Sequence, residues 1–534
     1  MERKILKNKI FLYFTEFFSG MSVMAVEMGA SRLLAPYFSS SEIVWTIIIG
    51  TIMIAMALGN LWGGHQADKK PDPDRLYMNI LVAAIWIALI PILGRYVILG
   101  VSGVLALIVK NNFLVWAALV SSLIIFVFPL LLLGKVTPSL ARYTVESTEE
   151  SGKIVGRLGA LNTIGSIIGT FLPTFVTIPS VGTSLTFLIF AAILLALCLV
   201  YFLTSRTKLI KTAIAIIIFI ICCVLSISTS FAFWEDDLLY EDESIYNYLQ
   251  VKETDESIIL STNVLFGVQS IMMKDDGPTG MYYDYALAAP VLAGADEESE
   301  MDVLILGLGT GTYANMCLKY FPNFNITGVE IDEDITELAY EYFNLSEEVT
   351  AITYDGRAYL DASDETWDII MVDAYQDITI PFQMSSVEFF TMVYEHLNEN
   401  GVMIVNMNMY SESANSINVA LSDTISSVFD AVYTVDVVGS TNCELFACKN
   451  SSALEGFEEN VYAIEDEELL SMLELTLSGI EEYEATDNIL TDDKAPVELL
   501  GMAAIDEIIT DELDYYLDIY DQYGLSGLLE RLMD

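Results

Sequence analysis

The chain has little histidine, and its cysteines form no metal-binding pattern. Its 534 residues include only His65 and His396. A Ser-His-Asp triad or a histidine-ligated zinc site needs more imidazoles than this, so neither mechanism is expected. The six cysteines follow no metal-ligand spacing, and three of them lie in apolar runs, where small buried side chains are the default. We therefore predict a protein that uses no metal.

Basic residues are scarce in the second part of the chain. Up to Trp234 we count 17 Lys/Arg and 10 Asp/Glu, which leaves 24 − 17 = 7 basic and 74 − 10 = 64 acidic residues beyond it. The net charges are thus +7 and −57. Such an acidic surface repels nucleic acid and attracts polycations, so we expect no nucleic-acid partner. A heavily solvated surface is an equally good interpretation.

Long hydrophobic runs are confined to residues 1–234. They raise the hydrophobic fraction to 54% and the mean hydropathy to +0.49, above ordinary soluble proteins. Each run is near the ~20 residues that cross a bilayer. The expected spans are 10–30, 43–64, 77–93, 112–134, 158–178, 183–203 and 212–233.

These runs predict an all-α polytopic membrane domain over 1–234 with about seven transmembrane helices, or eight if the short stretch 97–109 also crosses. The partner would be a lipid bilayer and the location the cell membrane. Basic flanking segments predict that the N-terminus is inside. Seven spans would place the acidic part outside the cell, whereas eight would place it inside.

Two acids, Glu16 and Glu27, lie in the first span. An acid within a membrane is expensive and marks a functional site or a buried partner. Arg32 follows closely and could pair with Glu27 or extend to the interface.

Beyond Trp234 the pattern becomes that of a soluble protein. Short strands near 246–251, 257–260 and 270–273 predict a small β subdomain over 235–280. Alternating strands and helices then predict a Rossmann-like domain over 281–505, of the class I methyltransferase type, with a doubly wound parallel sheet. Residues 506–534 are expected to form an acidic helical extension.

A glycine turn stands between the first strand and helix of that domain. Val303 to Leu306 reads as a buried strand, and Gly307, Gly309 and Gly311 follow it. Glycine lets the backbone approach a ligand where a Cβ would clash. The Gly-x-Gly-x-Gly pattern is not that of a dinucleotide site, so we favour a nucleoside without a pyrophosphate, such as S-adenosylmethionine or a relative.

Three acids each follow a predicted strand directly: Glu330, Asp355 and Asp373. Glu330 lies 23 residues after Gly307 (330 − 307), near the ~20 expected for an acid that binds ribose hydroxyls. A single acid there is often only a helix cap. Three of them should converge on one cleft, because ligands bind at the carboxyl ends of parallel strands. Asp355 would meet the adenine amino group, and Asp373 would accept a proton from a reacting amine.

These motifs resemble the spermidine synthase (polyamine aminopropyltransferase) family, in its membrane-fused branch. The resemblance covers roughly residues 240–500. It rests on Glu243 to Asn247, Leu265 to Gln269, Tyr282 to Asp284, Gly307 to Gly311, Val329 to Asp332, Asp355 to Arg357, Trp367 to Asp373 and Asp492 to Glu498.

The resemblance implies transfer of an aminopropyl group from decarboxylated S-adenosylmethionine to a diamine such as putrescine, giving spermidine and methylthioadenosine. It makes Asp373 the catalytic proton acceptor and, by analogy, suggests a homodimer. The implied nucleoside-binding residues are Gly307, Gly309, Gly311, Glu330, Asp332, Asp355 and Gly356. The implied substrate-binding residues are Tyr246, Asn247, Gln269, Tyr282, Asp284, Gln376 and Asp377.

Two alternatives stay open. Thr310 stands where the family usually has an acid for the aminopropyl amine, which favours an S-adenosylmethionine-dependent methyltransferase. The block from Tyr282 to Asp284 and the β subdomain favour the aminopropyltransferase. The membrane acids Glu16 and Glu27 motivate a third hypothesis, a non-catalytic polyamine sensor or transporter.

Overall fold

The computed structural model describes residues 8–533 except 107, 110, 146–150, 228–229, 236, 265–266, 375–379 and 409–415. The chain forms two compact units. The first comprises Met1–Asp236 and Asp242–Tyr248, and the second comprises Asp237–Glu241 and Leu249–Asp534. Each unit is described by itself.

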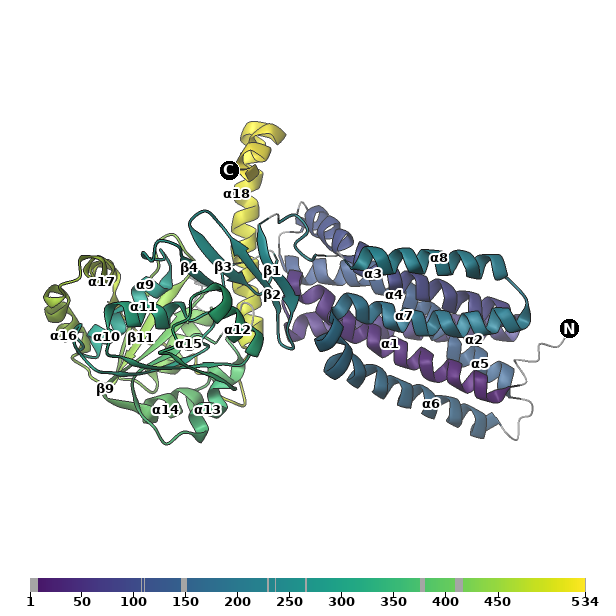
Figure 1. Cartoon of the computed structure of the whole chain (residues 1–534), viewed down its shortest axis with the longest axis horizontal. Coiled ribbons are helices and arrows are strands. Elements are labelled where there is room, and N and C mark those ends of the chain that lie inside the picture. The colour runs from purple at the N-terminus through teal and green to yellow at the C-terminus, as the bar shows by residue number, and fades with distance from the viewer. Residues whose placement is uncertain are drawn as a thin grey trace. The chain divides into compact units, whose positions relative to one another are not determined.

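The first unit consists of long helices, as the apolar runs predict (Figure 1). Asn8 and Ser41 cap the first two helices, each accepting a hydrogen bond from a backbone N–H of the first turn. The helices are α1 (Lys9–Phe38), α2 (Glu42–Lys69), α3 (Pro73–Ala106), α4 (Phe113–Gly134), α5 (Val136–Thr144), α6 (Ser151–Leu172), α7 (Ile178–Ser205) and α8 (Leu209–Ser226).

Six helical segments of the described chain are long and apolar enough to cross a membrane, where the sequence predicts about seven spans. The difference lies in Ser151–Ser205, which counts as one segment of 55 residues and holds two of the predicted spans. At 1.5 Å per residue a straight helix of that length would reach about 80 Å, far more than a bilayer core. The segment is not straight, because Gly182 leaves helical geometry with φ +76°.

Contacts with α1 show that α6 and α7 run in opposite directions. Gly165 and Gly169 of α6 lie against the backbone of Phe17 and Met21, in the same order along both helices. These glycines allow the close approach because a Cβ at either position would clash with an α1 carbonyl. On α7 the order is reversed, because Phe187 contacts Gly29 whereas Phe190 packs near Met21. Residues 151–205 therefore hold two antiparallel arms.

The structure contradicts one alternative for the first unit, a separate segment at 97–109. The stretch 97–109 is not a separate short segment, since its residues up to Ala106 continue α3 from Pro73. Pro91 lies inside that helix without ending it, as apolar helices with close neighbours tolerate.

Glu16 and Arg32 of α1 have hydrogen-bond partners. Glu16 is fully buried and accepts hydrogen bonds from the Thr137 hydroxyl at 2.5 Å and the Asn162 amide at 3.0 Å. The Arg32 guanidinium donates to the backbone carbonyls of Ser244 and Ile245. Of the two interpretations of Glu16, its contacts match the buried residue with hydrogen-bond partners.

A four-stranded sheet follows α8 in the chain, with strand order β1-β2-β3-β4. Its first strand was not predicted. The strands are β1 (Leu238–Glu243), β2 (Tyr248–Glu253), β3 (Ser257–Ser261) and β4 (Ser270–Met273).

The large sheet is mixed, and the prediction of a parallel sheet is wrong for one edge of it. Its order is β12-β10-β11-β9-β8-β5-β6-β7. Neighbours from β9 to β7 are parallel, whereas β11 runs antiparallel to both β9 and β10. Only residues 437–442 link β10 to β11, too few for the crossover that a parallel pair needs. The strands are β5 (Asp302–Leu306), β6 (Asn325–Glu330), β7 (Thr350–Thr353), β8 (Trp367–Val372), β9 (Leu397–Met407), β10 (Ala431–Asp436), β11 (Cys443–Cys448) and β12 (Glu481–Glu482).

Helices cover both faces of this sheet (Figure 1). The larger core forms where α9, α10, α11, α16 and α17 pack on alternate residues of the central strands. The final helix starts earlier than the predicted extension 506–534 and departs from helical geometry at Gly524. The helices are α9 (Tyr282–Ala286), α10 (Ala288–Leu292), α11 (Thr312–Tyr320), α12 (Glu333–Tyr342), α13 (Gly356–Ala362), α14 (Val387–His396), α15 (Ile417–Ser426), α16 (Ala453–Asn460), α17 (Glu467–Gly479) and α18 (Val497–Met533).

Candidate functional site

The glycine turn joins β5 to α11 and requires glycine for steric reasons. Gly307, Gly309 and Gly311 have φ of +92°, +55° and +81°, in the region that L side chains avoid. A Cβ at Gly307 would lie 2.5 Å from the carbonyl oxygen of Asp373. The turn therefore brings the end of β5 directly against the end of β8.

Glu330 ends β6 and holds this turn. Its side chain is 7% exposed, and its two oxygens accept hydrogen bonds from the backbone N–H of Gly309 at 2.9 Å and of Asp332 at 3.1 Å. Burial raises the pKa of Glu330, and the backbone donors oppose that shift. A carboxylate oxygen has two lone pairs, so each can still accept a ligand hydroxyl.

The other two carboxylates predicted to bind the nucleoside, Asp332 and Asp355, are helix caps. Asp332 caps α12 by accepting from the N–H of Asp334, and Asp355 caps α13 by accepting from the N–H of Ala358 at 2.8 Å. Gly356 is the first residue of α13. The helix-cap interpretation of a strand-end acid thus holds for Asp355. A cap does not exclude ligand binding by the second oxygen.

Asp373 follows β8 and is held by two donors. Its carboxylate accepts from the Tyr282 hydroxyl at 2.6 Å and from the Asn406 side-chain amide at 3.1 Å. Burial raises the pKa of Asp373 to about 7; the two hydrogen bonds oppose this shift, and the charge of Glu330 adds to it. A carboxyl with this pKa can take up a proton near neutral pH.

Tyr282 and Tyr283 lie side by side beneath this carboxylate, both 4% exposed and with ring centroids 4.0 Å apart. Burial, with the nearby charge of Asp373, raises the pKa of Tyr282 well above its usual value. The phenol therefore stays protonated and donates to Asp373. The Tyr283 hydroxyl donates to the backbone carbonyl of Gln269 at 3.2 Å.

Asp284 is not at the Asp373 carboxylate. It is 5% exposed and accepts from the N–H and hydroxyl of Thr279 at 2.9 and 2.7 Å and from the N–H of Gly280 at 2.7 Å. These bonds fix the turn before α9. The role implied for Asp284 in substrate binding has no support from this geometry.

The described structure does not test the roles of four other predicted substrate residues. Tyr246 and Asn247 belong to the first compact unit, where the N–H groups of both donate to the Ser244 hydroxyl. Gln376 and Asp377 lie outside the described residues. Their roles stay predictions.

Sequence reasoning missed Asn406 and the residue that orients it. Asn406 lies near the end of β9, and its amide oxygen accepts from the Asn442 side chain at 2.8 Å. This bond turns the amide NH₂ group towards Asp373. Asn406 could have been found as a site residue, because it is a polar residue at the end of an apolar strand. No local sequence feature indicates that Asn442 orients it.

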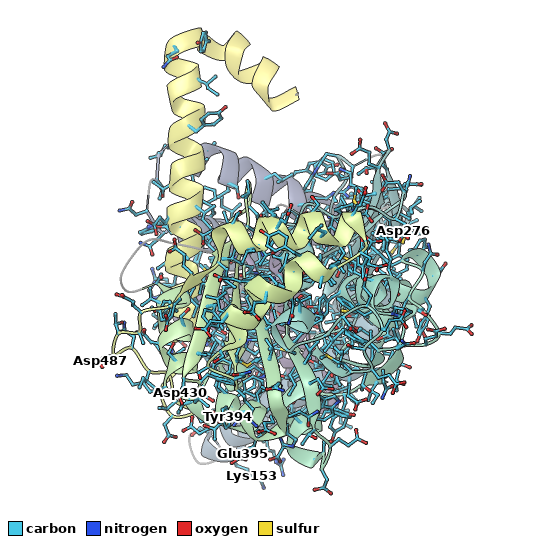
Figure 2. The ribbon with its side chains drawn as sticks, turned by 90° about the vertical axis from the view of Figure 1, so that its left-hand side faces the viewer. Lys153, Asp276, Tyr394, Glu395, Asp430 and Asp487 are labelled. Carbon is cyan, nitrogen blue, oxygen red and sulfur yellow. The ribbon has the colours of Figure 1, made fainter. Side chains whose placement is uncertain are left out.

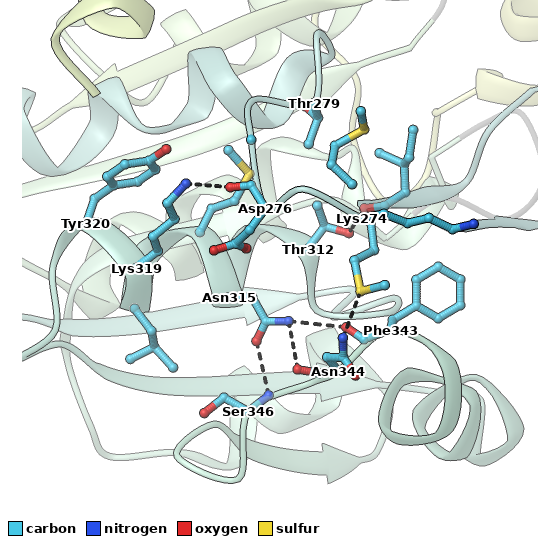
Figure 3. A pocket seen from close by; sticks show the side chains of 16 residues that line it. Lys274, Asp276, Thr279, Thr312, Asn315, Lys319, Tyr320, Phe343, Asn344 and Ser346 are labelled. Atoms are coloured by element: carbon cyan, nitrogen blue, oxygen red, sulfur yellow. Dashed lines mark hydrogen bonds between the residues drawn. The ribbon is translucent and has the colours of Figure 1, made fainter. Parts of the chain in front are cut away.

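A pocket of about 380 Å³ lies beside α11 and not at the strand ends (Figure 3). Lys319 and Asn315 point into this region, and their hydrogen bonds join α11 to the neighbouring loops at Asp276 and Ser346. None of the predicted site residues lines the pocket. It is therefore distinct from the cluster around Asp373.

Acidic side chains project from several parts of the second unit, as Asp276, Asp430 and Asp487 illustrate (Figure 2). Ion pairs between its described residues include Lys274–Glu253, Lys319–Glu468 and Arg357–Asp492. With 64 acidic and 7 basic residues beyond Trp234, most carboxylates there cannot pair with a basic side chain.

Comparison with known proteins gives a consistent family. Residues 288–453 match the family model described as "Spermine/spermidine synthase domain". The chain is 53% identical over 351 residues to a "Probable polyamine aminopropyl transferase" of Bifidobacterium longum, covering 62% of this chain and 78% of that protein. It is 25% identical over 306 residues to a "Polyamine aminopropyltransferase" of Vibrio vulnificus, covering 54% and 98%.

A solved structure titled as a spermidine synthase in complex with the transition state analogue AdoDATO aligns over 46% of this chain and 84% of that one. The TM-score is 0.38 and the identity 20%. The identification rests on the sequence relatives, which confirm the resemblance to the family. The chain belongs to the spermine/spermidine synthase family, the polyamine aminopropyltransferases, and is a transferase.

Proposed function

We propose that this transferase moves an aminopropyl group from decarboxylated S-adenosylmethionine to a diamine such as putrescine, giving spermidine and methylthioadenosine. The observation that carries the proposal is the Asp373 carboxylate. It is held between Tyr282 and Asn406 beside the glycine turn, with a pKa raised to about 7.

The proposed chemistry needs one proton acceptor. A primary amine arrives as an ammonium, whose nitrogen has no free lone pair for attack. Asp373 takes one proton, and the amine nitrogen then forms a bond to the carbon next to the donor's sulfonium. The carbon–sulfur bond breaks, its electron pair goes to sulfur, and neutral methylthioadenosine leaves.

The donor would bind at the ends of β5, β6 and β7. The glycine turn allows close backbone approach, and Glu330 is in place to accept ribose hydroxyls. Asp355, at the start of α13, is the candidate for the adenine amino group. The acceptor would lie on the Asp373 side, against Tyr282.

We also propose that the first unit is embedded in a lipid bilayer as a multi-pass anchor. Many of its large apolar side chains are exposed, such as Met53 at 66%, Leu61 at 74% and Ile210 at 79%. Exposed apolar side chains on long helices of this composition suit contact with lipid. Because residues 151–205 form two antiparallel arms, the six helical segments correspond to seven proposed membrane crossings.

Methyl transfer from S-adenosylmethionine is the second candidate, and Thr310 favours it. Thr310 is fully buried, and its N–H donates to the Ser270 hydroxyl at 3.4 Å. It offers no negative charge to an aminopropyl ammonium. A donor that keeps its carboxylate would not meet repulsion at this position.

The test is calorimetric titration of the full-length chain in detergent with decarboxylated S-adenosylmethionine, S-adenosylmethionine and methylthioadenosine. We expect the decarboxylated donor to bind more tightly than S-adenosylmethionine, and its complex to convert putrescine to spermidine. Preference for S-adenosylmethionine, with transfer of a methyl group, would replace the proposal by the second candidate.

A further inference from the structure

Glu444 is a charged residue in an otherwise uncharged strand, β11, whose sequence is Cys-Glu-Leu-Phe-Ala-Cys. Its side chain is fully buried. Within the part of the chain that the structure describes, neither of its carboxylate oxygens has a hydrogen-bond partner. Burying such a group without a partner is costly, so a fold would not retain it for stability.

The sheet places Glu444 in one row with Asp373 and Asn406. Glu444 is paired directly with Asn406 across β11 and β9, and Val405 is paired with Val372, the residue before Asp373. Side chains alternate between the faces of a sheet, so these three belong to the same face. Phe446 and Cys448, two and four residues beyond Glu444, are part of the core beneath α9 to α11.

Two strand spacings of ~4.8 Å separate the backbones of Asp373 and Glu444 by about 10 Å. The side chains reach from both ends of this interval towards the face covered by Tyr282. Burial raises the pKa of Glu444 well above its usual value, and the nearby charge of Asp373 adds to this shift. Unlike Glu444, Asp373 is only partly buried.

We infer that Glu444 is a specificity-determining residue, the second carboxylate of the acceptor site, which binds the distal ammonium of a diamine whose other amine lies at Asp373. This inference rests on the proposed function. An ammonium supplies up to three N–H donors and a positive charge. These are the hydrogen-bond partners and the compensating charge that the Glu444 carboxylate needs.

The role explains why an acceptor with two charges would be preferred. A monoamine bound at Asp373 leaves Glu444 without a compensating cation, whereas a short diamine satisfies both carboxylates. A hydrogen bond to a charged group contributes about 1.5–3 kcal/mol, which corresponds to roughly 10- to 100-fold in affinity.

The experiment compares full-length wild-type protein with Glu444→Gln and Glu444→Leu, using Glu474→Gln on the exposed side of α17 as the matched control. Each protein is assayed with 1,4-diaminobutane and with 1-aminobutane, by kcat/KM or by the inhibition constant where an amine binds without turnover. We expect both Glu444 variants to lose about tenfold or more with the diamine and less than about twofold with the monoamine. Donor affinity should not change.

Thermal unfolding separates this role from a structural one. Removing an unpartnered buried carboxyl should leave the Tm of Glu444→Leu equal to or above that of wild type while diamine selectivity falls. An equal loss with both amines, or no loss with either, would overturn the inference while leaving the proposed function standing. Wild-type protein that binds the donor and transfers to neither amine would instead overturn the proposed function.

Discussion

The Asp373 carboxylate combines two properties that oppose each other. Burial makes its ionised form less stable, while donors from Tyr282 and Asn406 make it more stable. The resulting pKa of about 7 lets a carboxyl act as a proton acceptor and still release the proton to solvent afterwards. Asn442 contributes from a distance, since it fixes which end of the Asn406 amide faces Asp373.

Asp373→Asn should abolish transfer and leave donor binding intact, because the amide keeps the size of the carboxyl and cannot accept the proton. We expect kcat to fall by about 10²- to 10⁴-fold, the usual contribution of a general base. Single-turnover kinetics and donor titration measure the two effects. Asp361→Asn, on the exposed side of α13, is the control; equal turnover in Asp373→Asn would remove the assignment.

The pH dependence of wild-type kcat/KM should rise through about pH 7, because Asp373 must be ionised to accept a proton and its pKa is raised to that value. Tyr282→Phe removes a donor that lowers this pKa. The rising limb should therefore move to higher pH in the variant. A pH–rate profile tests this, and a limb that stays in place would show that another group controls it.

At the scale of elements, two interactions hold the first turn of α13. Asp355 caps it, and Arg357 forms a bidentate pair with Asp492, with N–O distances of 2.8 and 2.7 Å. The Ser386 hydroxyl also donates to Asp492 at 2.5 Å. A segment far along the chain thus fixes the helix whose cap is the candidate adenine contact.

Asp492→Asn should lower the Tm at pH 7 by an amount that corresponds to less than about 1 kcal/mol, because the Asp492 side chain is 40% exposed and solvent screens the pair. The Arg357 guanidinium holds the pKa of Asp492 at about 2. The stabilisation is complete above the unfolded pKa of ~3.9 and is lost as pH falls towards 2. Tm values measured from pH 7 to 2.5 should therefore converge at acid pH. Asp493→Asn is the neighbouring control, and a Tm difference that persists at acid pH would contradict the pairing.

At the scale of the whole molecule, charge is divided as sharply as hydrophobicity. The apolar part carries +7 and the remainder −57. A field of that size attracts cationic acceptors over distances that salt shortens, since the Debye length falls from about 10 Å at 0.1 M to 3 Å at 1 M.

The KM for a diamine should therefore rise several-fold between about 0.05 and 0.5 M NaCl, because exposed carboxylates attract the acceptor less strongly when they are screened. Steady-state kinetics at fixed pH measure this. Inhibition by methylthioadenosine, which is neutral, is the internal control and should not change. A KM that does not depend on salt would show that only buried carboxylates recognise the acceptor.

Features that depend on neighbouring residues could be predicted from the sequence. Strand, glycine turn, helix and strand-end acid follow one another from Val303 to Glu330, so hydrophobic period and turn chemistry indicate the unit directly. The same holds for the long apolar helices and for the charge division. The placement of Asp373 beside the glycine turn could also be expected, because carboxyl ends of parallel strands meet at one edge.

Tertiary structure decided which distant residues meet. The antiparallel pairing of β11 with β9 cannot be recognised from local pattern, and its register alone brings Glu444 opposite Asn406 and Asn442 within reach of it. A shift of one residue would turn Glu444 to the other face. For Asp284 the sequence motif predicted substrate binding. In the structure its carboxylate instead accepts hydrogen bonds from the N–H and the hydroxyl of Thr279. Long-range pairing and competition for hydrogen bonds are properties of the folded chain, and only the structure could determine them.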